Sequence, residues 1–270
     1  MKNKLFLYLS FASLIFASCS SSGERDEPIV QPEKKILLSK ITTTYYDNPN
    51  NPDTSFDNLF YNDKGQLIKS VSGENRTATF EYDANGKPVK ALYYNAGNAL
   101  EYTSVYTYNG EELTNVKAVY DNSAYNRSYN LTYNNLGKLI SSSLCQGENC
   151  NNPNKETYTY NGDNIITEIN ETTTVYGLNT KREFTYDDNL NPFTYTNRYH
   201  KIMMGGAYAM SKNNYITEKI SYKDNNGNWI QNQTRNSTIQ YNNDKLPTQV
   251  VVKDQNGNNV VQYNYEYTIK

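Results

Sequence analysis

Hydrophobic and polar residues alternate with a period of two along most of the chain after residue 36. In residues 261–269, for example, Val, Tyr, Tyr, Tyr and Ile occupy every second position, with Gln, Asn, Glu and Thr between them. This alternation gives a strand one apolar and one polar face, which is typical of an antiparallel sheet with one buried and one solvated side. No segment after residue 18 has a helical period. The pattern therefore predicts an all-β protein.

A short phrase recurs at the end of every second predicted strand: an aromatic or aliphatic residue, then a tyrosine, then Asn or Asp, usually with Gly within four residues. Its tyrosines are Tyr61, Tyr82, Tyr108, Tyr133, Tyr160, Tyr186, Tyr241 and Tyr265. Successive copies lie about 26 residues apart, with a double period before Tyr241, which indicates one supersecondary unit repeated along the chain. Asn-Gly turns fall half a period later, so each unit reads as a β-hairpin.

Two strands per unit, with the chain ends added, predict a long antiparallel meander of roughly 16 to 18 strands. A flat sheet of that size leaves long unpaired edges, so we expect it to curl into a barrel-like or strongly curved sheet with the tyrosines inside. A barrel embedded in lipid needs an apolar band on its outer face. Here the second face carries Thr, Asn, Glu, Lys and Gln, so the pattern argues against a membrane-spanning barrel.

The chain start carries a predicted lipoprotein signal peptide over residues 1–18. Lys2 and Lys4 precede an apolar run that is too short for a transmembrane helix, which needs about 20 residues. The Cys19 that follows Ala17 and Ser18 resembles the lipidated cysteine of bacterial lipoproteins, which implies acylation and an outer-membrane anchor. The alternative is an ordinary cleaved signal with an incidental cysteine.

Residues 19–36 are small, polar and Pro-containing, so they predict a flexible tether. Acidic residues soon after the cysteine resemble the surface-export signal of Bacteroidota lipoproteins. This resemblance favours the cell surface over the periplasmic face of the outer membrane. Residues 37–270 are then a single repeat-built β domain.

Cys145 and Cys150 lie five positions apart within a predicted hairpin loop. In an exported protein such a pair predicts a disulfide that closes the loop. A metal site would need two further ligands, and the single His of the chain is distant in sequence. We expect no metal and no cofactor.

An irregular insert near residues 191–215 interrupts the meander. Long irregular segments in repeat proteins often carry function, so one interpretation is a loop or plug that shapes a binding mouth. The other is a packing device that fills the end of a barrel, since methionine suits irregular gaps. A Cu(I) site of His and Met ligands is a weaker third interpretation. The candidate side chains are Phe193, His200, Met203, Met204 and Met210.

The repeated phrase, as in residues 61–67 and 133–139, resembles the tyrosine-aspartate repeat of Rhs-type shell proteins. A closer resemblance is to a family of Bacteroidota lipoproteins of unknown function with a porin-like β fold. Three segments carry it: residues 186–193, which end in Asn-Pro-Phe, residues 211–214, which read Ser-Lys-Asn-Asn, and residues 246–248. The resemblance implies a fold and a compartment but no activity.

Charge and composition narrow the function. The net charge is −2 and no basic patch is present, so nucleic acid is a poor partner. No Ser or Cys lies in an activating motif, and neighbouring carboxylates alternate across strands. We therefore expect a non-enzymatic binding module for a glycan or another envelope ligand, since 27 tyrosines and many asparagines suit sugars. The alternatives are a structural or assembly lipoprotein that binds a partner protein and, less favoured, a glycan-active enzyme.

Overall fold

The computed structural model describes residues 35–147, 150, 153–172 and 178–270. The predicted signal peptide, Cys19 and the tether up to residue 34 lie outside the described residues. Within the described part of the chain, no helix is long and apolar enough to cross a membrane.

The described residues form sixteen β-strands, two short α-helices and one 3-10 turn. The strands are β1 (Ile36–Tyr45), β2 (Asp53–Tyr61), β3 (Leu67–Ser72), β4 (Thr77–Tyr82), β5 (Pro88–Tyr94), β6 (Leu100–Asn109), β7 (Glu112–Tyr120), β8 (Arg127–Tyr133), β9 (Leu139–Gln146), β10 (Asn154–Asn161), β11 (Asn164–Glu171), β12 (Thr180–Leu190), β13 (Asn213–Lys223), β14 (Trp229–Tyr241), β15 (Pro247–Lys253) and β16 (Asn259–Ile269). The helices are α1 (Arg198–Met204) and α2 (Gly206–Met210), and the 3-10 turn is η1 (Ser123–Tyr125).

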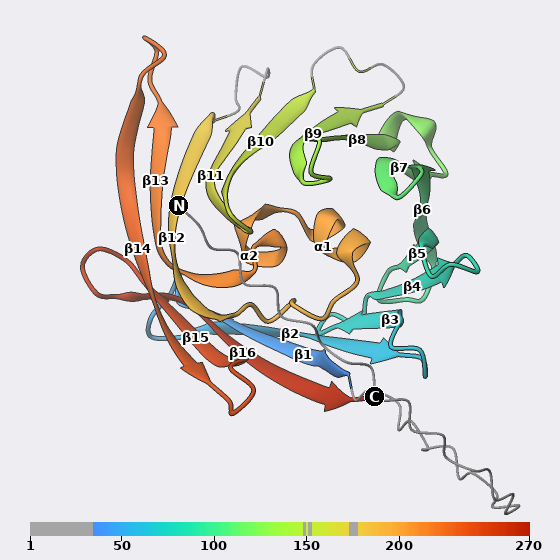
Figure 1. Cartoon of the computed structure of the whole chain (residues 1–270), viewed down its shortest axis with the longest axis horizontal. Helices are drawn as coiled ribbons and strands as arrows, with labels where there is room; N and C mark the ends of the chain where they lie inside the picture. The colour runs from blue at the N-terminus through green and yellow to red at the C-terminus, as the bar shows by residue number, and fades with distance from the viewer. Residues whose placement is uncertain (1–34, 148–149, 151–152, 173–177) are drawn as a thin grey trace, which may run out of the picture. The chain divides into compact units, whose positions relative to one another are not determined.

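Each strand pairs antiparallel with the next, and β1 closes the sheet against β16 (Figure 1). In that closing ladder Ile41 lies opposite Tyr265 and Lys40 lies opposite Glu266. The predicted all-β meander is therefore confirmed, and its curvature is complete: the sheet is a closed barrel. Closure removes both sheet edges, which would otherwise present unpaired backbone groups.

The repeat tyrosines fasten the hairpins at one end of the barrel. In seven of the eight strand pairs, the hydroxyl of a tyrosine near the end of the even-numbered strand donates to the backbone carbonyl of a residue near the start of the preceding odd-numbered strand. In the eighth, Tyr241 of β14 donates instead to the carboxylate of Asp187. The pairs are Tyr61 with Leu38, Tyr82 with Leu67, Tyr108 with Pro88, Tyr133 with Leu113, Tyr160 with Leu139, Tyr186 with Ile165 and Tyr267 with Pro247. In the last repeat this bond belongs to Tyr267, so the assignment of Tyr265 as the repeat tyrosine is wrong.

The turn after each tyrosine explains the rest of the phrase. In the first copy, the side-chain Oδ1 of Asn62 accepts hydrogen bonds from the backbone N–H groups of Lys64 and Gln66, each at 3.0 Å. Gly65 has a φ of 74°, a conformation that glycine adopts without steric cost. The phrase therefore encodes one tight turn with its own side-chain cap.

Near the start of the odd-numbered strand that follows each of these tyrosines, one extra residue bulges from the strand. The bulged residues are Ile68, Val89, Thr114, Ile140, Ile166, Ile216 and Thr248. Bulges bend a strand and increase its twist, and they are common at barrel rims. Their repetition around one rim gives the sheet the curvature that closure requires.

The predicted irregular insert is present between β12 and β13, and Figure 1 shows its two helices inside the ring of strands. The prediction that no helix follows residue 18 is wrong here. Helices of five and seven residues are too short to show a period in sequence, and they depend on tertiary packing for stability. The side chain of Asn197 caps α1 by accepting a hydrogen bond from the N–H of Tyr199, and Gly205 separates the two helices.

Candidate functional site

The insert is held against the inner wall by three apolar clusters. Tyr199 packs with residues of β5, β6 and β7, Ala207 packs with residues of β9 to β12, and Phe193 with Ala209 packs on Leu38 of β1. Each cluster joins the insert to a different sector of the barrel. The insert therefore forms an internal plug at the end where the tyrosine turns lie.

Buried polar side chains lock both ends of this plug. The amide of Asn191 donates to the carbonyl of Tyr208 at 2.6 Å, and the amide of Asn214 donates to the carbonyl of Leu190 at 2.8 Å. The hydroxyl of Ser211 accepts a hydrogen bond from the N–H of Ile165 at 3.0 Å. All three residues are buried. The Asn-Pro-Phe and Ser-Lys-Asn-Asn segments thus act as the two anchors of the plug.

His200 is buried in the plug, where its Nε2 lies 2.7 Å from the hydroxyl of Tyr82. That hydroxyl already donates to the carbonyl of Leu67, so the imidazole is the donor to Tyr82. The ring of Phe80 packs edge-on against the imidazole at 4.8 Å. Burial lowers the pKa of His200 to about 4, so the ring is neutral. In the described residues, no group of three or more His, Cys, Asp or Glu side chains is placed to hold a metal ion.

The other predicted insert residues have two roles. Phe193 is buried, and Met203, Met204 and Met210 pack against the apolar clusters of the wall. Phe193 and Met204 also line two cavities in the barrel, and Met203 lines the second of them. Phe193, Met203 and Met204 therefore form the surface of the plug that faces the lumen cavities. Met210 lines neither of these cavities.

The first lumen cavity has a volume of about 410 Å³. Four tyrosine rings and four charged side chains contribute to its lining, and they come from β2, β12, β13, β14, β16 and the plug. They are Tyr208, Tyr215, Tyr263, Tyr265, Asp57, Arg182, Glu218 and Arg235. The size lies within the usual range of small-molecule sites, roughly 300–1,000 Å³.

Glu218 is the central charge of this cavity. Its Oε1 lies 3.5 Å from Nε of Arg182, and its Oε2 lies 3.7 Å from Nη1 of Arg235. Both contacts are longer than close charge-assisted hydrogen bonds of about 2.7–2.9 Å. The Nε of Arg235 is buried and has no hydrogen-bond partner. The group therefore keeps hydrogen-bonding capacity that its own members do not use.

A second cavity of about 310 Å³ adjoins the first. The two share four lining residues: Ile41, Asp57, Phe193 and Met204. His200 and Tyr106 line the second cavity, which is the more apolar of the two. Burial raises the pKa of Asp57, which lies between the cavities.

Glu168 of β11 is 5% exposed and contacts the plug. Its Oε1 accepts a hydrogen bond from the backbone N–H of Ala207 in α2. Burial raises the pKa of Glu168 to about 7, the negative charge of Glu156 adds to this, and the hydrogen bond from Ala207 opposes it. The small cavity beside these carboxylates measures about 90 Å³, too small for a sugar ring.

A row of stacked tyrosines covers another part of the inner wall. The rings of Tyr93 and Tyr102 stack at 4.3 Å, and the rings of Tyr102 and Tyr120 stack at 4.8 Å. Because their faces cover one another, these rings stabilise the wall across three neighbouring strands. Tyr125 of η1 is 64% exposed beside the row.

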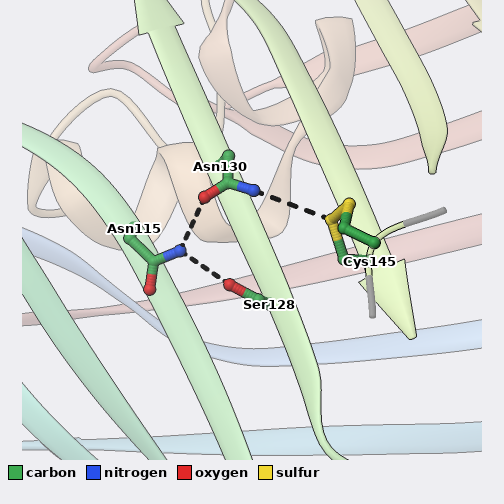
Figure 2. The surroundings of a disulfide bond; sticks show 5 residues. Asn115, Ser128, Asn130 and Cys145 are labelled. Carbon is green, nitrogen blue, oxygen red and sulfur yellow. Dashed lines mark hydrogen bonds between the residues drawn. A yellow bond between two sulfur atoms is a disulfide. The ribbon is translucent and has the colours of Figure 1, made fainter. Parts of the chain in front are cut away.

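Cys145 and Cys150 are joined by a disulfide, with their Cα atoms 4.8 Å apart. Figure 2 shows its surroundings: the amide of Asn130 donates to the sulfur of Cys145 at 3.7 Å. The amide of Asn115 donates to Asn130 at 2.8 Å and to Ser128 at 2.7 Å. The alternation puts Cys145 on the outer side of β9, away from the lumen, because its neighbour Leu144 shares the inner face with Tyr129.

Sequence reasoning missed the Arg182–Glu218–Arg235 group. Arg182 alternates with Phe184 and Tyr186, so a charged residue on a tyrosine face was the available signal. Glu218 gave no such signal, because strict alternation from Tyr215 places it on the outer face. The bulge at Ile216 shifts the register and turns Glu218 inward.

No protein-family model matches the chain, and no curated protein matches it. Several solved structures do match, and two porin-like proteins are among them. A porin-like protein from Bacteroides uniformis is 16% identical, with a TM-score of 0.56, over 86% of this chain and 98% of that one. A porin-like protein from Bacteroides vulgatus is 10% identical, with a TM-score of 0.56, over 87% of this chain and 99% of that one. These likenesses show the fold, and the predicted porin-like β fold is confirmed.

Proposed function

We propose that this chain is a non-enzymatic binding lipoprotein that takes a glycan into the first lumen cavity. The observation that supports this is the combination of tyrosine rings with the Arg182–Glu218–Arg235 group around a volume of about 410 Å³. Aromatic rings provide apolar area for the faces of sugar rings. Charged groups form strong hydrogen bonds with hydroxyl groups. Arginine donors and a carboxylate acceptor on one wall match a ligand that carries both donors and acceptors.

The proposal of a non-enzymatic role is supported by the hydrogen bond that Glu168, the carboxylate with the most strongly raised pKa, already accepts. Glu168 already accepts a hydrogen bond from the plug, and its adjoining cavity is smaller than a sugar ring. Glu218, in the larger cavity, lies between the guanidinium groups of Arg182 and Arg235 and forms an ion pair with each. Neither carboxylate is placed as a free general acid.

Charged side chains on the outer face of the barrel support the proposal that the barrel is anchored to the membrane but lies outside the bilayer. Lys40 pairs with Glu266 at 3.1 Å on the closing strands, and Lys181 pairs with Glu183 at 3.0 Å on β12. A Lys or Arg side chain facing lipid destabilises a barrel by about 2–4 kcal/mol at the bilayer midplane, and Asp or Glu by less. The proposed attachment is therefore the acylated Cys19 in the outer membrane, with the domain at the cell surface.

Binding by the full chain, purified in a non-ionic detergent, tests the ligand class. A panel of soluble glycans and polysaccharides is titrated and followed by calorimetry. We expect saturable binding that weakens about tenfold or more in Arg235→Gln, because a hydrogen bond to a charged group is lost. Lys253→Gln, an exposed residue on the neighbouring strand, is the matched control and should bind as the wild type does. The absence of binding to every glycan in the panel would contradict the proposal.

Protease treatment of intact cells tests the location, with a periplasmic protein as the control. Loss of the domain on shaving is the expected result. Protection would place the domain in the periplasm and favour the competing hypothesis of an assembly lipoprotein. That hypothesis is supported by the repeat tyrosines, whose hydroxyls are already bonded within the wall. It predicts a specific protein crosslink and no glycan binding.

A further inference from the structure

A separate pocket of about 420 Å³ lies at the end of the barrel that carries the tyrosine turns. It opens between α1, the β8–β9 turn and the β10–β11 turn. Within the described residues, it shares no lining residue with the two lumen cavities. Its base includes the apolar side chains of Leu139, Ile202 and Met210.

The charged lining of this pocket is strongly cationic. Four cations contribute to it: Lys138, Arg198, Lys201 and Lys212. The one carboxylate among its described lining residues is Asp163, whose Oδ1 accepts from Nζ of Lys138 at 2.9 Å. Arg198, Lys201 and Lys212 form no ion pair with this carboxylate in the described structure, although the charge of Lys212 also helps to lower the pKa of Asp163.

Neighbouring carboxylates do not neutralise these cations. The nearby Glu111 forms an ion pair with Lys87 at 2.7 Å. Lys87 is the main cause of the lowered pKa of Glu111, and the charge of Arg198 contributes to it. Of the carboxylates in the described part of the chain, none forms an ion pair with Arg198, Lys201 or Lys212. The guanidinium of Arg198 lies 5.3 Å from the centre of the Tyr199 ring, a contact that leaves its N–H donors available.

Lys201 is the innermost of the three. It is half-buried, and no hydrogen-bond partner of its ammonium group is present in the described structure. Burial lowers the pKa of Lys201. A partly buried ammonium without a partner is unfavourable, and a bound anion would supply both the opposite charge and the missing acceptors.

We propose that this pocket binds a phosphate group, with Lys201 at its base and Lys138, Arg198 and Lys212 around it. A phosphate carries several oxygens and up to two negative charges, so it can engage several of these donors at once, and arginine matches its geometry. The chemistry is shared by free phosphate and by the phosphate of a lipid headgroup. The start of β1 lies at this same end of the barrel, where the carbonyl of Leu38 accepts a hydrogen bond from the hydroxyl of Tyr61. The site is independent of the proposed lumen function.

The test uses the full chain in a non-ionic detergent and two probes. Inorganic phosphate and the soluble short-chain lipid dihexanoyl-phosphatidylglycerol are titrated separately, and binding is followed by calorimetry. We expect saturable binding of at least one probe. Loss of a hydrogen bond to a charged group should weaken that binding about tenfold or more in Lys201→Met. Lys212→Glu, at an exposed residue that cannot disturb the core, should weaken it as well.

The control is Lys245→Glu, an exposed lysine in the turn between β14 and β15. It makes the same change in net charge outside the pocket, so unchanged affinity is expected. Tighter binding of inorganic phosphate would identify a free anion as the ligand, and tighter binding of the lipid would identify a headgroup. Saturable binding of neither probe, or equal affinities in wild type, Lys201→Met and Lys212→Glu, would overturn the proposal.

Discussion

The hydroxyl of Tyr133 donates a hydrogen bond to the backbone carbonyl of Leu113, 2.8 Å away, across the β7–β8 hairpin. The same bond recurs from hairpin to hairpin around one rim. It explains why a tyrosine, and not a phenylalanine, stands at this position of the phrase. The ring of Tyr133 packs against an apolar cluster inside the barrel, and its hydroxyl supplies a hydrogen-bond donor to a carbonyl beside the bulge at Thr114.

Replacement of Tyr133 by Phe should therefore destabilise the barrel. We expect a loss of about 1 kcal/mol in the free energy of unfolding, because a partly buried carbonyl loses its donor. Urea unfolding, followed by circular dichroism, measures the change. Tyr125→Phe is the control, since the hydroxyl of Tyr125 has no partner in the described structure. Equal stability of Tyr133→Phe and wild type would show that water replaces the lost bond.

Gly137→Ala should cost about 1–2 kcal/mol through the backbone alone. Gly137 has a φ of 70°, and a methyl group added there meets no atom within 4 Å. Gly97→Ala is the matched control, because Gly97 lies in another exposed turn without a positive φ. Urea midpoints of the two variants separate backbone strain from the loss of a glycine as such. Similar midpoints for the two variants would rule out strain as the cause.

Glu168 should make the fold less stable as the pH rises from about 4.5 to 7. Its pKa is raised to about 7 in the folded state from 4.5, so the folded protein binds more protons than the unfolded chain in that window. The shift corresponds to about 3 kcal/mol. Glu168→Gln should remove this dependence and gain stability relative to the wild type at higher pH. The measurement is unfolding free energy of both proteins at pH 5, 6, 7 and 8, and parallel profiles would contradict the assignment.

His200 should have the opposite effect on the pH dependence of stability: its contribution makes the fold less stable as the pH falls. Its pKa falls to about 4 in the fold from 6.5, so its contribution is present above pH 6.5 and is lost as the pH falls towards 4. The loss amounts to about 3 kcal/mol. In the wild type it opposes the gain from Glu168 between pH 4.5 and 6.5. His200→Gln should therefore expose a stability that rises on acidification, and a wild-type-like profile in this variant would refute the prediction.

The disulfide between Cys145 and Cys150 closes a short loop, so its contribution is modest. Chain entropy for a ring of this size gives about 2 kcal/mol. The double variant Cys145→Ser and Cys150→Ser should lose no more than that in urea. Thiol titration of the unfolded, non-reduced chain should find neither of these cysteines free, and two reactive thiols from this pair would show that the bond does not form.

Local chemistry determined the repeating unit. The phrase that begins at Tyr61 contains the turn cap Asn62 and the positive-φ Gly65, and all three act within a few residues of one another. The alternation between turns then identified strands and the inner face. These features depend on neighbours in sequence, so the all-β meander and its approximate number of strands were predictable.

Only the tertiary structure decided closure and the lumen. The ladder between β1 and β16 joins residues more than 200 positions apart, as in the pair Ile41 and Tyr265, and no local signal selects it. The bulge at Ile216 reverses the facing of Glu218, and the plug carries His200 to Tyr82 across the barrel. A one-residue shift in register moves a side chain from solvent to core. The sequence by itself therefore determined the hairpins, while the charges that gather inside the barrel were set by bulges and long-range pairing, which sequence periodicity does not report.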